Sequence, residues 1–158
     1  MLDATLTDRI KAAVAAGFAE QTRFTSELTA LPSLRGAEAP AQDVMASAYH
    51  AAGLAGDRFK VELDPIRHPP GFSPVMVSYD DAWNVVGAHR ASNPRGRSLI
   101  LNGHIDVVPT GPVEMWSDPP FQPHIEGDWL YGRGAGDMKA GLVAGLYAYK
   151  ALRAIGLA

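Results

Sequence analysis

The spacing of apolar residues predicts two helices in the first third of the chain. Residues 3–31 carry apolar side chains at intervals close to the helical repeat, which places them along one face of a helix. These positions are Leu6, Ile10, Val14, Phe18, Phe24 and Leu28. The helix is expected to end before Pro32, because the residue preceding a proline resists helical backbone angles. A second helix is predicted over residues 39–52, with Pro40 in its first turn and Gly53 as its C-terminal cap.

Other patterns predict strands in the middle of the chain. Residues 59–63 alternate between apolar and polar side chains, and residues 83–88 form a second extended run. Between them lies a long connection rich in proline and glycine, residues 64–81. Residues 99–101 are all apolar and are expected to form a short strand buried on both faces. Residues 125–131 predict a hairpin that turns around a Glu-Gly-Asp sequence.

The last helix is predicted over residues 138–155. It is apolar on more than one face, so we expect it to be deeply packed. Its apolar side chains are Leu142, Val143, Leu146, Tyr147, Tyr149 and Leu152. The predicted elements follow the order helix, helix, strand, strand, strand, hairpin, helix, which favours an α/β layer architecture with a mixed sheet.

Composition narrows the class of protein. The 158 residues are 47% apolar and 20% charged, which is typical of one domain with a packed core. The net charge is −3 and no cluster of Lys and Arg occurs, so no nucleic-acid partner is expected. The apolar stretch at residues 12–19 is too short to span a membrane, and no membrane partner is expected. The absence of cysteine excludes disulfides, thiolate zinc sites and a cysteine nucleophile, and it fits a cytoplasmic protein without requiring it.

Two short segments carry the side chains with the clearest chemical potential. His104 and Asp106 lie two positions apart after a predicted strand, so an extended backbone would direct both to the same side. Asp137 follows a glycine-rich turn at the start of the last helix. Imidazole and carboxylate groups are the ligands of hydrolytic zinc sites. Taken singly, each residue also has a structural interpretation, as a hydrogen-bonded histidine of the fold or as an aspartate that caps a helix.

The remaining candidate residues are interpreted as structural. The pair Asp80-Asp81 is expected to be solvated, and Trp116 is expected to anchor its loop. His50 falls on a predicted helix, at the surface or partly buried, and His68 is a loop residue with no partner nearby in the sequence. His89 and His124 lack a carboxylate at a useful spacing. No G-x-S-x-G elbow is present, and the glycines near Asp137 do not have the spacing of a dinucleotide-binding loop.

Three motifs together resemble one family of metal-dependent amidohydrolases and peptidases. The motifs are Gly103-His104-Ile105-Asp106-Val107-Val108-Pro109, then Trp116 with Asp118-Pro119-Pro120-Phe121, then Tyr131-Gly132-Arg133-Gly134-Ala135-Gly136-Asp137-Met138-Lys139. The family contains acetylornithine deacetylase, succinyl-diaminopimelate desuccinylase, aminoacylases and related carboxypeptidases. Leu31-Pro32-Ser33 with Glu38 is similar to its N-terminal signature, so the resemblance runs from about Thr25 onward.

The resemblance implies a fold and a set of roles. The implied fold is a three-layer α/β/α zinc-peptidase-like catalytic domain with a mixed sheet, in a truncated form without the lid and dimerisation domain. The implied cofactors are two divalent metal ions, with zinc expected in preference to cobalt. His104 would be a ligand to one metal, Asp137 the ligand that bridges both, and Asp106 the catalytic carboxylate that orients His104. The family resemblance also implies a cis peptide bond between Asp137 and Met138.

Several parts of the family's site have no counterpart here: a Glu-Glu pair that includes the general base, another acidic ligand and a late histidine. We therefore interpret residues 1–158 as the N-terminal portion of a metallohydrolase catalytic domain, inactive by itself. The parent is expected to hydrolyse the amide bond of an N-acyl amino acid, in the manner of acetylornithine deacetylase, with a metal-activated water. The alternatives are a dipeptidase or carboxypeptidase of the same family, or a non-catalytic binding or assembly module.

The expected partners are a small N-acyl amino acid or a short peptide, and a homo-oligomer is compatible with the sequence. A truncated domain is also expected to expose apolar surface on the last helix and an open sheet edge. Both features would favour self-association.

Overall fold

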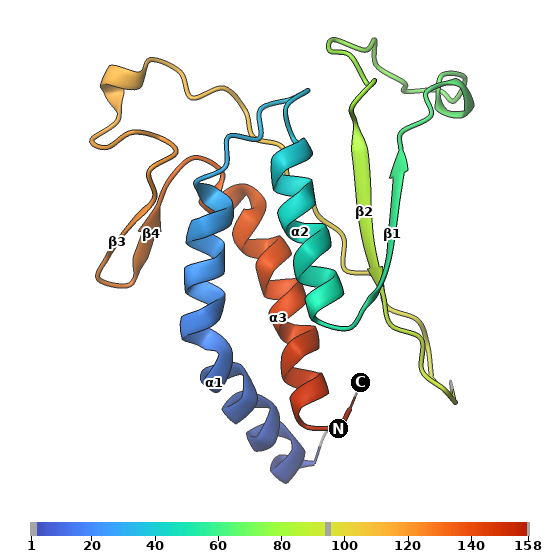
Figure 1. Ribbon diagram of the computed structural model, residues 1–158, viewed down its shortest axis with the longest axis vertical. Helices are drawn as coiled ribbons and strands as arrows, with labels where there is room; N and C mark the ends of the chain where they lie inside the picture. Colours follow the sequence, from blue (N-terminus) through green and yellow to red (C-terminus); the bar gives the residue numbers. More distant parts are fainter. Residues whose placement is uncertain (1–2, 94–95, 158) are drawn as a thin grey trace.

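Three helices lie side by side at the centre of the molecule (Figure 1). The computed structural model describes residues 3–93 and 96–157. The helices are α1 (Ala4–Thr29), α2 (Ala39–Ala51) and α3 (Ala140–Ala154), which confirms the three predicted helices. As expected, Pro40 lies in the first turn of α2. Gly53 follows that helix with a φ of 75°, a backbone angle that glycine adopts at little cost.

One core joins the three helices. Leu28 of α1, Met45 of α2 and Val143 of α3 are almost completely buried in the same cluster. Leu146 and Tyr147 extend this cluster along α3, as the apolar pattern of the last helix predicts. Ile105 also belongs to the core, so the segment that carries His104 and Asp106 is anchored directly on the helices.

Two hairpins flank the helices. β1 (Ala55–Lys60) pairs antiparallel with β2 (Trp83–Ala88), and Figure 1 shows this hairpin beside α2. β3 (His124–Glu126) pairs antiparallel with β4 (Trp129–Tyr131) on the side of α1. A side chain at Gly87 would place its Cβ 2.8 Å from a ring carbon of Tyr49 on α2, so a glycine there allows β2 to pack closely on that helix.

The predicted strands are only partly correct. The first strand covers Ala55–Lys60 rather than residues 59–63, because its position is set by pairing with β2, in which Ala55 lies opposite Ala88. The predicted strand at residues 99–101 is wrong. These residues form no strand, and their side chains are 81%, 85% and 63% exposed rather than buried. Within the described residues no strand lies beside them, and an extended segment needs such a partner for its backbone hydrogen bonds.

The sheets are simpler than the expected mixed sheet. Both are two-stranded and antiparallel, and the one parallel pairing within residues 3–93 and 96–157 is a single bridge between Leu34 and Val107. Helices and small sheets together make an α/β arrangement, whereas the three-layer architecture stays a prediction.

The sequence predicts exposed apolar surface on the last helix, and this prediction is wrong. The exposed apolar residues lie on connecting segments instead. α3 turns Val143, Leu146, Tyr147 and Ala151 inward, and its outer face carries small and polar residues. The large apolar residues with the greatest exposure are Met76, Leu99, Ile100 and Met115. In the part of the chain that the structure describes, no helix combines the length and hydropathy that a bilayer crossing requires.

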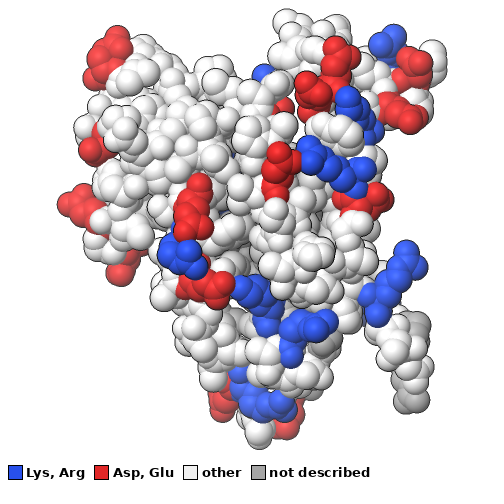
Figure 2. All heavy atoms as spheres, viewed as in Figure 1, with Lys and Arg blue, Asp and Glu red and all other residues white. Residues whose placement is uncertain are grey.

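Charged side chains of both signs mix over the helices on the face shown in Figure 2. Around the short η2 helix (Val113–Met115) and the β3–β4 hairpin, the visible charged groups are acidic. Glu114, Asp118, Glu126 and Asp128 belong to this region.

Candidate active site

The segment that carries His104 and Asp106 is fixed to the loop that follows α1. The buried Ser33 hydroxyl donates a hydrogen bond to the Ile105 carbonyl at 2.6 Å, and the Val107 amide donates one to the Ser33 carbonyl at 2.8 Å. Ile105 and Val107 are buried. Since neighbouring residues of an extended segment point to opposite sides, His104 and Asp106 face outward together. This arrangement agrees with the expectation from their spacing, although within the described residues no strand leads directly into them.

Asp137 lies in a short kinked turn, η3 (Ala135–Lys139), just before α3. The backbone at Asp137 and Met138 departs from helical angles, with φ of −126° and −137°. Gly134 precedes this turn with a φ of 82°, and a Cβ there would lie 2.3 Å from a methyl carbon of Val107. The turn therefore requires glycine, both for its left-handed angle and for its close approach to the His104 segment. The expected cis peptide bond between Asp137 and Met138 is present.

Asp137 does not cap a helix, so the structural interpretation of this residue is wrong. α3 begins at Ala140, its N-cap position is Lys139, and no side chain caps it. The Asp137 side chain is 91% exposed and is directed to the surface beside His104.

Lys139 connects the Asp137 turn to the end of α1. Its side chain is fully buried, and its Nζ donates hydrogen bonds to the carbonyls of Leu28 at 3.0 Å and Leu31 at 2.7 Å. These carbonyls lie at the C-terminal end of α1, which attracts a cation. Burial away from water lowers the pKa of Lys139 to about 8.

The three predicted site residues come together in space. His104 Nε2 lies 3.0 Å from Asp137 Oδ1. The other ring nitrogen, Nδ1, lies 3.2 Å from Asp106 Oδ1 and 3.0 Å from the Asp106 carbonyl oxygen. Each imidazole nitrogen therefore faces an oxygen, with Asp106 on the inner side and Asp137 on the solvent side.

These contacts shift the protonation of His104. Burial acts to lower the pKa of the imidazole. Its hydrogen bonds to the Asp106 carbonyl and the Asp137 carboxylate, together with both negative charges, act in the opposite direction and outweigh burial. The pKa of His104 is therefore raised, so the imidazolium form persists to higher pH than in a free histidine.

A cavity of about 400 Å³ opens in front of this cluster. Besides the three predicted residues, its lining includes Arg35, Arg133 and three glycines, Gly132, Gly134 and Gly136. Arg35 Nε lies 3.3 Å from Asp106 Oδ2. The sequence analysis misses both arginines. Arg35 is far from Asp106 in the chain, so no local spacing could connect them, whereas Arg133 falls inside the glycine motif and could have been noticed there.

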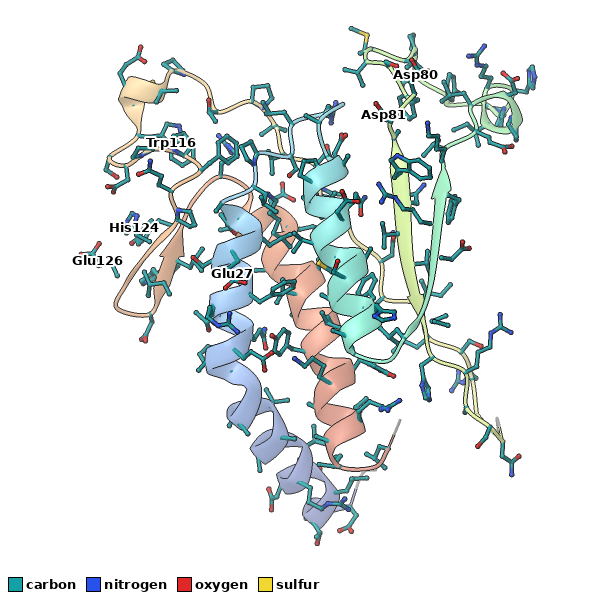
Figure 3. The ribbon with its side chains drawn as sticks, viewed as in Figure 1. Glu27, Asp80, Asp81, Trp116, His124 and Glu126 are labelled. Atoms are coloured by element: carbon teal, nitrogen blue, oxygen red, sulfur yellow. The ribbon has the colours of Figure 1, made fainter. Side chains whose placement is uncertain are left out.

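Trp116 anchors its loop, as the sequence predicts. Its indole N–H donates a hydrogen bond to the Thr110 carbonyl at 2.9 Å, and the Arg133 guanidinium lies 4.9 Å from the centre of its ring. His124 stacks on Tyr131 with ring centres 5.1 Å apart and lies 3.6 Å from Asp118 Oδ2, so it does have a carboxylate neighbour. Trp116 and His124 lie in the same loop-and-hairpin unit (Figure 3).

The other residues interpreted as structural lie outside the cavity. Asp80 and Asp81 lie just before β2, and Figure 3 shows them beside the start of that strand. His50 and His68 are exposed. His89 Nδ1 lies 3.2 Å from the Tyr149 hydroxyl.

The geometry of the cluster can be tested against a metal ion. Two ligands of one tetrahedral zinc, each about 2.1 Å from the ion, lie about 3.4 Å apart. His104 Nε2 and Asp137 Oδ1 are 3.0 Å apart, so a shift of a few tenths of an ångström admits an ion between them. Asp106 on Nδ1 supplies the outer contact that orients a histidine ligand. Among the described residues, no group of three or more His, Cys, Asp or Glu side chains is arranged to hold a metal. The donors present therefore fit part of a metal centre.

Comparison with known proteins finds one sequence profile and several curated relatives that this chain resembles. Residues 100–158 match the sequence profile of peptidase family M20/M25/M40. The chain is 37% identical over 123 residues to a succinyl-diaminopimelate desuccinylase of Acidovorax ebreus, covering 77% of this chain and 29% of the relative. It is 47% identical over 83 residues to the enzyme of that name from Thioalkalivibrio sulfidiphilus, covering 52% of this chain and 21% of the relative. Delftia acidovorans has a further relative, 36% identical over 123 residues, with coverage of 77% and 28%. The chain thus spans less than a third of the length of these curated relatives.

Proposed function

Because residues 100–158 match the profile of peptidase family M20/M25/M40, we propose that the chain supplies part of the active site of a metal-dependent hydrolase that cleaves the amide bond of an N-acyl amino acid. The observation that supports this most directly is the contact between His104 and Asp137, with Asp106 on the opposite ring nitrogen. Imidazole and carboxylate converge at the mouth of a cavity, which suits a centre that must remain open to substrate.

The two outward donors, His104 Nε2 and an Asp137 oxygen, would hold a divalent cation, with Asp137 as the bridge between two ions and zinc preferred over cobalt. When bound, such ions polarise the substrate carbonyl and lower the pKa of water. Asp106 accepts a hydrogen bond from the Nδ1–H of His104, which leaves the Nε2 lone pair directed outward. The Arg35 contact to the second Asp106 oxygen holds that carboxylate in place.

The general base and the remaining ligands are not identified among the described residues, so we expect the 158-residue chain to have no turnover of its own. N-acetylornithine is our first substrate to test. N-succinyl-diaminopimelate is the second, because the relatives are named for it. Zinc- or cobalt-dependent release of acetate or succinate by this chain alone would contradict the assignment of a partial site.

Metal binding tests the site without turnover. Zinc titrated into the chain, followed by calorimetry and by the NMR resonances of the His104 ring, should bind at this cluster. His104→Ala and Asp137→Asn should each weaken binding at least about tenfold, and Asp106→Asn by about 10–100-fold, because partners of a ligating histidine contribute that much to metal affinity. His124→Ala is the matched control, since that histidine also has an aspartate neighbour but lies outside the cavity lining. Equal affinity in His104→Ala and wild type would remove the support for a metal centre here.

Activity provides the second test. In any longer protein that contains this chain, His104→Ala should abolish zinc-dependent release of the acyl group, whereas His124→Ala should not. Near-normal turnover of the His104→Ala protein would show that the site is elsewhere.

A further inference from the structure

Two arginines share the cavity with the metal-type cluster. Arg35 reaches it from the loop after α1, and Arg133 from the turn before η3. They are separated widely in sequence but line the same space of about 400 Å³, together with His104 and Asp137. Arg35 contacts Asp106 through Nε alone, and Arg133 contacts none of the three residues of the cluster that are named above, so the guanidinium groups are available for another role.

The protein does not satisfy the hydrogen-bonding capacity of Arg133. The guanidinium packs against the face of Trp116, which fixes its plane. Its recorded hydrogen bond within the described chain is a long one, from Nη2 to the Thr110 carbonyl at 3.4 Å. Its Nε is buried and has no partner among the described residues. A guanidinium carries five N–H donors, and buried donors are normally paired, so this group is short of acceptors.

Arg35 is also only partly paired. Its Nε contacts Asp106 at 3.3 Å, and two-thirds of its side chain is exposed to solvent. No hydrogen bond of its terminal nitrogens to another described residue is recorded. Asp106 already interacts with His104 through its other oxygen, so the negative charge of Asp106 is shared between two cationic or polar partners.

The wall between Arg133 and Asp137 consists of small residues. Gly132, Gly134 and Gly136 line it, and a Cβ added at Gly136 would meet no atom within 4 Å. The cavity is therefore open at Gly136, next to Asp137, whereas a Cβ at Gly132 or Gly134 would meet Thr29 or Val107. A planar ligand group can approach there, and the flat, fork-shaped guanidinium matches a carboxylate better than any other common anion-binding side chain does.

We propose that Arg35 and Arg133 form a carboxylate-binding subsite beside the metal-type cluster, which selects substrates that carry a free carboxylate next to the amide to be cleaved. This rests on the proposed function, because the ligand is the substrate of that hydrolysis. Arg133 provides the fixed donor, held by Trp116. Arg35 provides the adjustable one, tied at Nε to Asp106. A substrate carboxylate held between them brings its neighbouring amide to the cavity shared with His104 and Asp137.

Binding of simple anions tests the subsite without metal or turnover. The metal-free chain, dialysed against a chelator at low ionic strength, is titrated with succinate, and the indole N–H resonance of Trp116 is followed by NMR because Arg133 lies against that ring. Succinamide, which has the same skeleton without charge, is the ligand control. Succinate is expected to shift the Trp116 resonance saturably, and succinamide is not.

Variants assign the binding to the two arginines. Arg133→Gln and Arg35→Gln are each expected to weaken succinate binding at least about tenfold, because each removes a charge-assisted hydrogen bond. Arg23→Gln, which removes an exposed arginine paired with Glu27 on α1, should stay within about twofold of wild type. Arg133→Lys keeps the charge but loses the fork and should bind more weakly than wild type. If Arg133→Gln does not fold, Arg133→Lys and Arg35→Gln decide the matter.

Two outcomes would overturn the subsite: succinate affinity that is equal in wild type and in the Arg35 and Arg133 variants, or inorganic phosphate that binds more tightly than succinate. The second would indicate a phosphate site. Arginine-dependent succinate binding in a protein that never hydrolyses an N-acyl amino acid would sink the proposed function and leave the subsite standing. Hydrolysis of an N-acyl amino acid at the same rate in the wild type and in both arginine variants would support the proposed function and contradict the subsite.

Discussion

At Gly134 the turn that carries Asp137 closely approaches the segment that carries His104 and Asp106. Its φ of 82° disfavours any side chain, and a Cβ would lie 2.3 Å from a methyl carbon of Val107. Gly134→Ala should therefore lower the free energy of unfolding by about 2–4 kcal/mol, the sum of a left-handed backbone penalty and a core clash. Urea denaturation measures this loss directly.

Gly136, two positions further on, is the matched control. It has ordinary backbone angles, and a Cβ there would meet nothing within 4 Å. Gly136→Ala should stay within about 0.5 kcal/mol of wild type. Equal stability of the two alanine variants would show that there is room for a methyl group between residue 134 and Val107.

Lys139 predicts an unusual dependence of stability on pH. Burial lowers its pKa to about 8, whereas the unfolded side chain has a pKa near 10.5. Between these values the unfolded chain holds the proton and the folded chain does not, so stability rises with pH. The neutral amine still carries two N–H groups for the Leu28 and Leu31 carbonyls. We expect the free energy of unfolding to increase by about 1–3 kcal/mol from pH 7.5 to 9.5.

Urea titrations at several pH values test the role of Lys139. In Lys139→Met the rise should disappear, and in Lys11→Met, an exposed lysine of α1, it should remain. If the free energy of unfolding still increased with pH in Lys139→Met, the increase would not come from Lys139, and the prediction would be wrong.

At this scale, sequence reasoning works where the chemistry is local. The two-residue spacing of His104 and Asp106 correctly places both beside each other. It fails for Asp137 as a helix cap, because the backbone at Asp137 and Met138 departs from helical angles and α3 begins only at Ala140, two residues after the predicted start. It also fails for Arg35, whose partner Asp106 is 71 positions away.

Among the elements, the loop that follows α1 holds the His104 segment through Ser33. Its hydroxyl is buried and donates to the Ile105 carbonyl at 2.6 Å. Ser33→Ala leaves that buried carbonyl without its partner, which should cost about 1–3 kcal/mol of stability. It should also broaden or shift the NMR resonances of the His104 ring. Ser47→Ala is the control, because that exposed hydroxyl bonds only within its own helix. Unchanged stability and His104 resonances in Ser33→Ala would mean that the segment is held by other contacts.

The helices were predictable and the strands only partly so, for a physical reason. A helix satisfies its backbone within its own segment, so the spacing of Leu28 or Val143 in the sequence is enough to indicate it. A strand needs a second segment, and the position of β1 follows from its pairing with β2 rather than from its own alternation. Residues 99–101 have the composition of a buried strand but, within the described residues, no neighbouring strand.

For the whole molecule, the exposed apolar segment at residues 99–101 predicts self-association. Ile100 is 85% exposed, between two leucines that are also exposed. An apolar extended segment with unpaired backbone is a common template for association between copies. Sedimentation should show a mass that increases with concentration, and Ile100→Lys should shift the molecule toward the monomer. Met115→Lys, at an equally exposed apolar residue on η2, should not. A clean monomer at high concentration would contradict this.

The direction of α3 has a consequence for how a complete metal site could be assembled. The helix starts at the cluster and leads away from it. Its 15 residues, at about 1.5 Å each, carry the chain about 22 Å to the opposite pole. There Arg9 contacts the Ile155 carbonyl at 2.8 Å, and Figure 1 shows the start of α1 at the same pole. A ligand supplied from beyond the end of α3 could join His104 and Asp137 only after the polypeptide had travelled back along that length, at least about seven extended residues. Completing a metal site in this way would bring together residues that are distant in the sequence. Contacts of that kind form slowly in folding. The cluster of His104, Asp106 and Asp137 would then form first, and binding of the metal would be among the last events in maturation.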